Sequence, residues 1–323
     1  MKYNENSRFQ PMNTPKKTSW PIIIRWVGTV LSLALLVWLL SKAGLRETWQ
    51  VARQLSAWRL LAVVGLVFVS RVATFLRWNT LLSVENARVG WRESLKLTFA
   101  GLFSSNFLPT TIGGDVVRLA GAIRLNLDAS LAAASLVADR LVGMTGMVLV
   151  LPFAIPGALT YLRDRPAGNG LAPAWTSASV IGVAWQKLKD AFVKVFSNFR
   201  FWIKHPLILL QALGFTLVHQ LALYLIIRLL IEGMGYHLPL TQIAGIWSLT
   251  YFISLIPISI NGLGLQELTI TNLYSVLGGL PTSATISLAV ILRALFLIAS
   301  LPGAFFVPAI LAGRDVSKLN PEA

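Results

Sequence analysis

Long apolar stretches dominate the pattern of residues along this chain of 323 residues. Five of them exceed the roughly 18 to 20 residues that an α-helix needs to cross the hydrocarbon core of a bilayer. The sequence therefore predicts an all-α polytopic membrane protein. The predicted spans are residues 21–40, 60–82, 131–155, 206–231 and 282–311.

Two further segments, residues 94–119 and 249–280, begin apolar but are interrupted by proline and glycine. The apolar part before each break is too short to cross a membrane, and proline ends or kinks a helix. We predict two re-entrant helical elements, which bring the total to about six to eight transmembrane helices; a helix end followed by a surface loop is the alternative. The break residues are Pro109, Gly113, Gly114, Pro257, Gly262 and Gly264.

The two breaks resemble each other. Leu-Pro-x-x-Ile-Gly-Gly from Leu108 matches Ile-Pro-x-x-Ile-Asn-Gly from Ile256, and each break is followed by a span with an internal arginine, Arg140 or Arg293. Repeats with interrupted apolar segments are typical of transporters that bind substrate at the repeat interface. With the amino terminus on the cytoplasmic side, the two elements enter from opposite faces, which predicts an inverted repeat.

The remaining segments are polar or amphipathic. Surface helices are expected near residues 45–58 and 185–204; the second is strongly basic, and its alternative is a stop-transfer flank. Residues 1–20 and 312–323 are predicted cytoplasmic tails around one transmembrane domain, residues 21–311. The first span follows a long polar region, so it is interpreted as uncleaved and not as a signal peptide.

Composition narrows the function. Hydrophobic residues make up 55% of the chain and charged residues 13%, with a mean hydropathy of +0.67, which excludes an ordinary soluble domain. The formal net charge of +15 lies mostly between spans, which indicates positive-inside topology and anionic lipid headgroups as partners, and not nucleic acid. The chain has no cysteine and only three dispersed histidines, so we expect no catalytic constellation, metal or cofactor.

Charged residues inside the apolar segments are the strongest candidates for function. An arginine at the centre of a span, such as Arg140, costs roughly 2.5 to 3.5 kcal/mol on insertion scales. Asp139 precedes it, but adjacent residues on a helix point about 100° apart, so each is expected to have a partner on another segment. His219 and Gln220 are interpreted as packing or hydrogen-bonding residues and not as a proton relay.

These motifs, taken in order, resemble the lysylphosphatidylglycerol synthase transmembrane region, a family of flippase-like bacterial and archaeal membrane proteins. The resemblance extends from about residue 21 to 311. The chain departs from the family pattern at Asp139, where glutamate is usual, at Gln266, where a basic residue is usual, and in a shortened apolar region around Ala174. The motifs are Arg77-Trp78, Asn106-Phe-Leu-Pro109, Gly113-Gly114-Asp115, Arg118, Asp139-Arg140, Pro257, Gly262-Leu-Gly264-Leu-Gln266-Glu267 and Arg293.

The resemblance implies a multi-pass flippase in the cytoplasmic (inner) membrane of a prokaryote. It would move an aminoacylated or glycosylated phospholipid, or an isoprenoid-linked sugar, between leaflets, and we expect the chain to lack the aminoacyl-transfer enzyme of some relatives. Buried cations would bind lipid phosphate, and we predict that Arg140 and Glu267 belong to one connected site. The candidate substrate-binding residues are Arg77, Asn106, Asp115, Arg118, Asp139, Arg140, Gln266, Glu267 and Arg293.

Two alternatives stay open. One is a membrane-embedded enzyme that uses Asp115, Asp139 and Glu267 for acid–base or metal chemistry. The other is a scaffold subunit for a lipid-modifying enzyme, which would dock on the basic segment 185–204.

Overall fold

The computed structural model describes residues 56–83, 90–106, 108, 113–163, 205–256 and 262–311. Every regular element in these ranges is a helix. Both tails, the first predicted span, nearly all of the two predicted surface helices, the region around Ala174, and Pro109 and Pro257 at the breaks lie outside them.

Within the described ranges, four helices are long and apolar enough to cross a membrane. They are α3 (Ala57–Leu82), α6 (Ala129–Val150) with its extension to Leu159, α9 (Pro206–Gly233), and α12 (Thr282–Ser300) with its extension to Phe305. Four of the five predicted spans are therefore confirmed. Trp58, which was assigned to the first surface helix, belongs to α3.

Two spans end as α-helices earlier than predicted. The 3₁₀ turns η2 (Leu151–Ala154) and η6 (Leu301–Phe305) follow α6 and α12, and each begins Leu-Pro. Proline has no N–H to continue the α-helical hydrogen bonds, so the helix tightens there. The predicted spans 131–155 and 282–311 are therefore present, but each contains a 3₁₀ turn that the sequence did not predict. The short helices after the two turns are α7 (Ile155–Arg163) and α13 (Val307–Leu311).

The two interrupted segments fold as pairs of short helices. The first pair is α4 (Trp91–Ser105) and α5 (Gly113–Arg124); the second is α10 (Leu240–Ser254) and α11 (Leu265–Val276). Both pairs have 15 and then 12 residues, or about 22 and 18 Å, which is less than a bilayer core of about 30 Å. The second pair begins at Leu240, earlier than the predicted 249, and α5 extends beyond 119.

Glycines shape both pairs. Gly114 on α5 packs directly on the backbone of Gly101 on α4, and a Cβ at Gly114 would collide with the Gly101 carbonyl oxygen. In the second pair, Gly262 and Gly264 have φ of 67° and 79°, backbone angles that glycine adopts most readily. In the first pair, the two glycines allow the backbones of α4 and α5 to approach closely. In the second pair, glycines with positive φ form the turn that begins α11.

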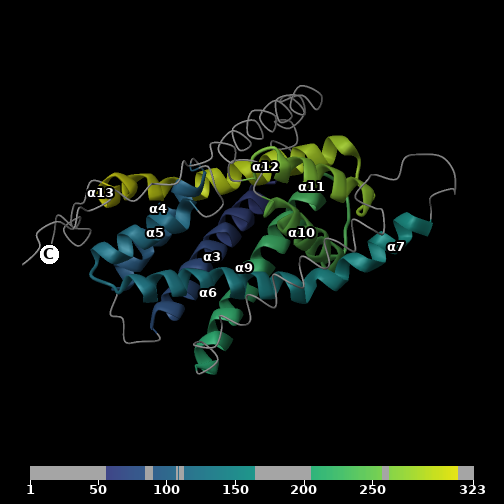
Figure 1. Cartoon of the computed structure of the whole chain (residues 1–323). Coiled ribbons are helices and arrows are strands. Elements are labelled where there is room, and N and C mark those ends of the chain that lie inside the picture. Colours follow the sequence, from purple (N-terminus) through teal and green to yellow (C-terminus); the bar gives the residue numbers. More distant parts are fainter. Residues whose placement is uncertain are drawn as a thin grey trace, which may run out of the picture.

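The two pairs lie at opposite ends of the helix bundle (Figure 1). From the α4–α5 end, α6 runs toward α10, and from the α11 end, α12 runs back toward α4. Each 3₁₀ turn packs on the other pair: Gly245 of α10 lies against Ala154, and Gly303 lies against the Phe99 carbonyl of α4. The repeat seen in the sequence is therefore also present in the packing.

The central helices α3 and α9 pack side by side between the two ends. The largest apolar core joins α9, α10, α11 and α12 around Ile227, Ile246 and Tyr274. A second core, around Trp78 and Leu97, joins α3, α4, α5 and α6. Both cores hold the charged side chains of the repeats in fixed positions.

Candidate functional site

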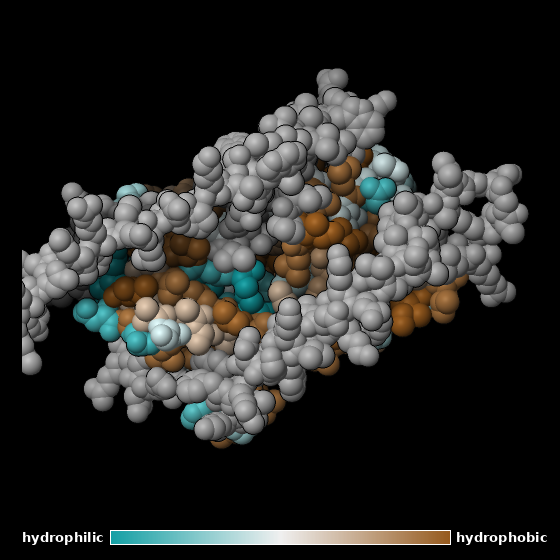
Figure 2. Space-filling view, viewed as in Figure 1, coloured by the Kyte–Doolittle hydropathy of each residue, from teal (hydrophilic) through white to brown (hydrophobic). Residues whose placement is uncertain are grey.

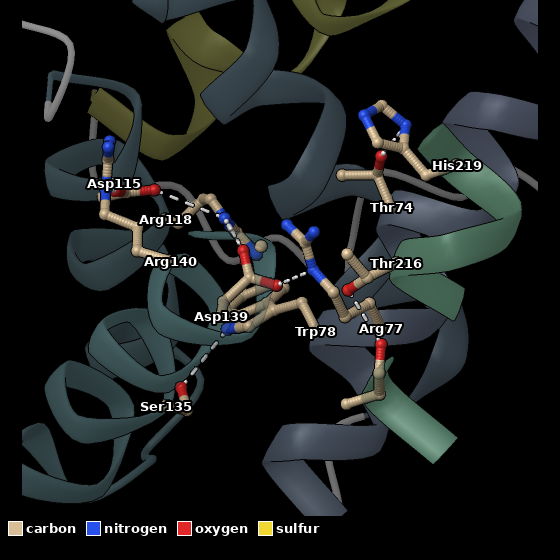
Figure 3. Close-up of polar contacts among 12 residues, drawn as sticks. Thr74, Arg77, Trp78, Asp115, Arg118, Ser135, Asp139, Arg140, Thr216 and His219 are labelled. Atoms are coloured by element: carbon tan, nitrogen blue, oxygen red, sulfur yellow. Dashed lines mark hydrogen bonds and ion pairs between the residues drawn. The ribbon is translucent and has the colours of Figure 1, made fainter. Parts of the chain in front are cut away.

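The centre of the site is Asp139 on α6, which is bound by two arginines from other helices (Figure 3). Arg77 of α3 donates from Nε to Oδ1 at 2.6 Å, and Arg118 of α5 donates from Nη1 to Oδ2 at 3.2 Å. All three side chains are buried: Asp139 is 5% exposed, Arg77 12% and Arg118 8%. Pairing of this kind is what buried charges require.

The network continues to Asp115 and Arg140. Arg118 Nη1 lies 3.3 Å from Asp115 Oδ1, and Arg140 Nε donates to Asp115 Oδ2. Asp139 and Arg140 therefore each find a partner on another segment, and that prediction is confirmed. The whole network consists of Arg77, Arg118, Arg140, Asp115 and Asp139, and its formal charge is +1. Their most exposed member is Arg140, whose side chain is 29% exposed.

Trp78 fixes the position of Arg118. The guanidinium carbon of Arg118 lies 4.0 Å from the centroid of the Trp78 ring, a favourable cation–π distance. Trp78 is fully buried, and its indole N–H donates to Ser135 Oγ at 3.2 Å. Nε and Nη2 of Arg118 are buried without a hydrogen-bond partner among the described residues. This guanidinium therefore has unused hydrogen-bond donors.

The second repeat has its own pair, Glu267 and Arg293. Glu267 Oε2 accepts from the N–H of Gly264 at 2.7 Å, and Oε1 accepts from Arg293 Nε. Glu267 is the third residue of α11, as Asp115 is of α5, and a helix start favours negative charge. The partner arginine follows 25 residues after Asp115 and 26 after Glu267. The repeat therefore extends to the charged pairs.

The other two predicted site residues lie apart from the network of Asp139. Gln266 lines a small pocket together with Glu267, Arg293 and Phe296. Asn106, at the end of α4, donates from Nδ2 to Ser300 Oγ at 2.9 Å and so joins α4 to the end of α12. A single site that connects Arg140 with Glu267 stays a prediction.

One residue near the network, Tyr251, was not predicted as a site residue from the sequence. It belongs to α10 of the second repeat and lies in the neighbourhood of Arg77 and Arg140. The only signal for Tyr251 was its place six residues before Pro257, where the first repeat also has an aromatic residue. His219 on α9 lies 2.8 Å from Ser70 Oγ on α3, in agreement with the hydrogen-bonding role expected for it.

The surface agrees with an internal polar region. In Figure 2, hydrophilic residues lie in a hollow between apolar residues on either side. Apolar residues on the outside of the spans, such as Phe68 and Leu207, are mostly exposed, as expected of a lipid-facing surface.

The fold and the charged network define a class, the polytopic helical membrane proteins with ion pairs inside the bundle. The chain belongs to the family described as the lysylphosphatidylglycerol synthase TM region, whose pattern matches residues 25–303. The resemblance inferred from the motifs is confirmed.

A curated relative is the UPF0104 membrane protein PH1989 of Pyrococcus horikoshii. It is 26% identical over 137 residues, which cover 42% of this chain and 40% of that protein. No solved structure matches the chain.

Proposed function

We propose that the protein moves an amphiphilic lipid with a charged headgroup, a phospholipid or a lipid-linked sugar, between the two leaflets of a prokaryotic cytoplasmic membrane. In this proposal, the pairs α4–α5 and α10–α11 are re-entrant elements that enter from opposite faces. The match to a family named for a lipid synthase supports a role with membrane lipids; the archaeal relative is named as a membrane protein.

The observation that carries the proposal is the network of Arg77, Asp115, Arg118, Asp139 and Arg140. Ionisable residues inside a membrane are costly, and those that face a bundle interior mark the paths of substrates and ions. This network joins three helices, has a surplus positive charge, and is partly accessible at Arg140. A lipid phosphate would add the missing negative charge, and Asp115 offers an acceptor to an amine on an aminoacylated headgroup.

The partners of the carboxylates support binding over catalysis. Asp115, Asp139 and Glu267 each accept a hydrogen bond from at least one guanidinium, so each carboxylate already has a fixed partner inside the protein. A general acid must hold a proton, and a general base must reach the proton that it removes. We therefore propose a transporter and not an enzyme.

The test is leaflet exchange by the full chain in vesicles of phosphatidylcholine with a trace of phosphatidylglycerol labelled on one acyl chain. Arg140→Ala and Glu267→Gln are expected to slow exchange by about tenfold or more, the loss of one charge-assisted contact. Arg228→Gln is the matched control, because the ion pair of Arg228 with Glu232 lies at the end of α9 and 45% of the Arg228 side chain is exposed.

Unchanged exchange in both Arg140→Ala and Glu267→Gln would refute the role assigned to these residues. Mass spectrometry of the recovered lipid separates transport from chemistry: a modified lipid would favour the membrane enzyme. Exchange that requires an added partner would favour the scaffold.

A further inference from the structure

One face of α3 carries a polar stripe between the two charged groups. Ser70, Thr74 and Arg77 follow helical spacing along it, and Arg71 lies at its edge. Ser70 Oγ and Thr74 Oγ1 both contact His219 Nδ1, at 2.8 and 3.3 Å. Arg77 marks one end of the stripe, and Arg71 lies about 9 Å from it along the helix axis.

Arg71 differs from the other arginines of the bundle interior. Arg77, Arg118, Arg140 and Arg293 each pair with a carboxylate, whereas Arg71 has none among the described residues. Its Nε is buried and without a hydrogen-bond partner in the part of the chain that the structure describes. A guanidinium in this situation is costly inside a membrane unless an anion neutralises it.

The surroundings of Arg71 supply the rest of a binding site. Its guanidinium carbon lies 5.4 Å from the centroid of the Phe296 ring on α12. Phe296 lines the pocket that also contains Gln266, Glu267 and Arg293. Arg293 sits one turn before Phe296, and its Nη2 is buried without a hydrogen-bond partner among the described residues. Phe296 is thus close to the guanidinium of Arg71 and lines a pocket with Arg293, and each of the two arginines has an unused donor.

We propose that Arg71 and Arg293 bind the phosphate group of an anionic phospholipid beside Phe296. The guanidinium fork matches phosphate oxygens, and the two arginines together with Glu267 carry a net charge of +1, which one phosphodiester neutralises. Ile270 and Leu292, both buried, also line the pocket and make part of its wall apolar. This proposal rests on the proposed function in one respect only, namely that the phosphate belongs to a lipid.

This is a second binding site for the lipid headgroup. The first is the network of Arg77 and Asp139, and the polar stripe on α3 lies between the two sites. Between them, the hydroxyl groups of Ser70 and Thr74 contact His219 of α9, so polar groups occupy this part of the contact between α3 and α9.

The test measures binding to the purified full chain in detergent, by native mass spectrometry with phosphatidylglycerol, phosphatidylcholine or inorganic phosphate. Wild type is expected to prefer phosphatidylglycerol over phosphatidylcholine by about tenfold. Arg71→Gln should lose most of that preference and Arg71→Lys part of it. Arg59→Gln, in the first turn of the same helix, should keep it.

A preference that survives in both Arg71 variants overturns the proposal. So does equal binding of inorganic phosphate and phosphatidylglycerol by wild type, because the ligand would then be the free anion.

Stability separates a binding role from a structural one. Without anionic lipid, Arg71→Gln should unfold at the same temperature as wild type or higher, because it removes a buried charge without a carboxylate partner. Added phosphatidylglycerol should raise the midpoint of wild type and of Arg59→Gln, but not of Arg71→Gln. A lower midpoint for Arg71→Gln, with the lipid effect retained, contradicts the proposal.

The two proposals fail differently. A chain that binds phosphatidylglycerol through Arg71 but exchanges no lipid rejects the proposed function and keeps the site. If the wild-type chain exchanges lipid but Arg71→Gln binds phosphatidylglycerol as well as wild type does, the proposed function is kept and the site at Arg71 is rejected.

Discussion

The substitution Asp139→Asn tests the network at its centre. Asp139 is the carboxylate that Arg77 and Arg118 share, and its side chain is 5% exposed. Arg118 keeps Asp115 at 3.3 Å, whereas Arg77 retains no carboxylate within 4 Å among the described residues. Removing one partner of a buried ion pair leaves an uncompensated charge, so we expect the free energy of unfolding to fall by about 3 to 5 kcal/mol.

The assay is unfolding of the full chain in mixed micelles with increasing dodecyl sulfate, followed by tryptophan fluorescence. Arg228→Gln breaks an exposed ion pair and should cost about 1 kcal/mol or less. Asp139→Glu keeps the charge and should lose less than Asp139→Asn. The double variant Asp139→Asn with Arg77→Gln should recover part of the loss, because the unpaired guanidinium is gone.

An Asp139→Asn protein no less stable than Arg228→Gln would refute this reasoning. It would mean that solvation by water, and not the carboxylate, stabilises the charges of Arg77 and Arg118.

Three further predictions concern packing and backbone, each measured by the same unfolding assay. Gly114→Ala should destabilise the protein by about 1 to 3 kcal/mol, because the added methyl group meets the Gly101 carbonyl; Gly214→Ala, with nothing within 4 Å, should be neutral or stabilise α9 by up to about 1 kcal/mol. Gly264→Ala should lower the free energy of unfolding by about 1 to 2 kcal/mol, since φ is 79° there and alanine is strained at that angle. A variant as stable as wild type would contradict this. Trp78→Phe should cost about 1 to 2 kcal/mol through loss of the bond to Ser135 and a weaker contact with Arg118; a smaller loss than for the exposed Trp91→Phe would count against its role.

The spans could be predicted from the sequence because length and hydropathy alone define them. The helix ends could not. Apolar residues continue past Pro152 and Pro302, so hydropathy shows no boundary, although the backbone changes to a 3₁₀ turn there. Proline was recognised as a break at Pro109 and Pro257, but not at Pro302, although Gly303 follows it directly.

The need for partners at Asp139 and Arg140 followed from helical geometry, but the identity of the partners did not. Arg77 lies 62 residues before Asp139, and Asp115 lies 25 before Arg140. Those distances are set by how α3, α5 and α6 pack, and no local pattern contains that information. Arg71 lies inside the predicted span 60–82 but was not among the candidate site residues, since only the structure places it on Phe296.

The central claim is that a charged lipid headgroup crosses the membrane through this site. It is tested most directly by the rate of leaflet exchange of labelled phosphatidylglycerol and phosphatidylcholine in vesicles that contain the wild-type chain, with protein-free vesicles beside them. The account predicts faster exchange of phosphatidylglycerol, which Arg140→Ala abolishes and Arg228→Gln leaves intact. Exchange no faster than in protein-free vesicles, or exchange that Arg140→Ala leaves unchanged, would contradict it.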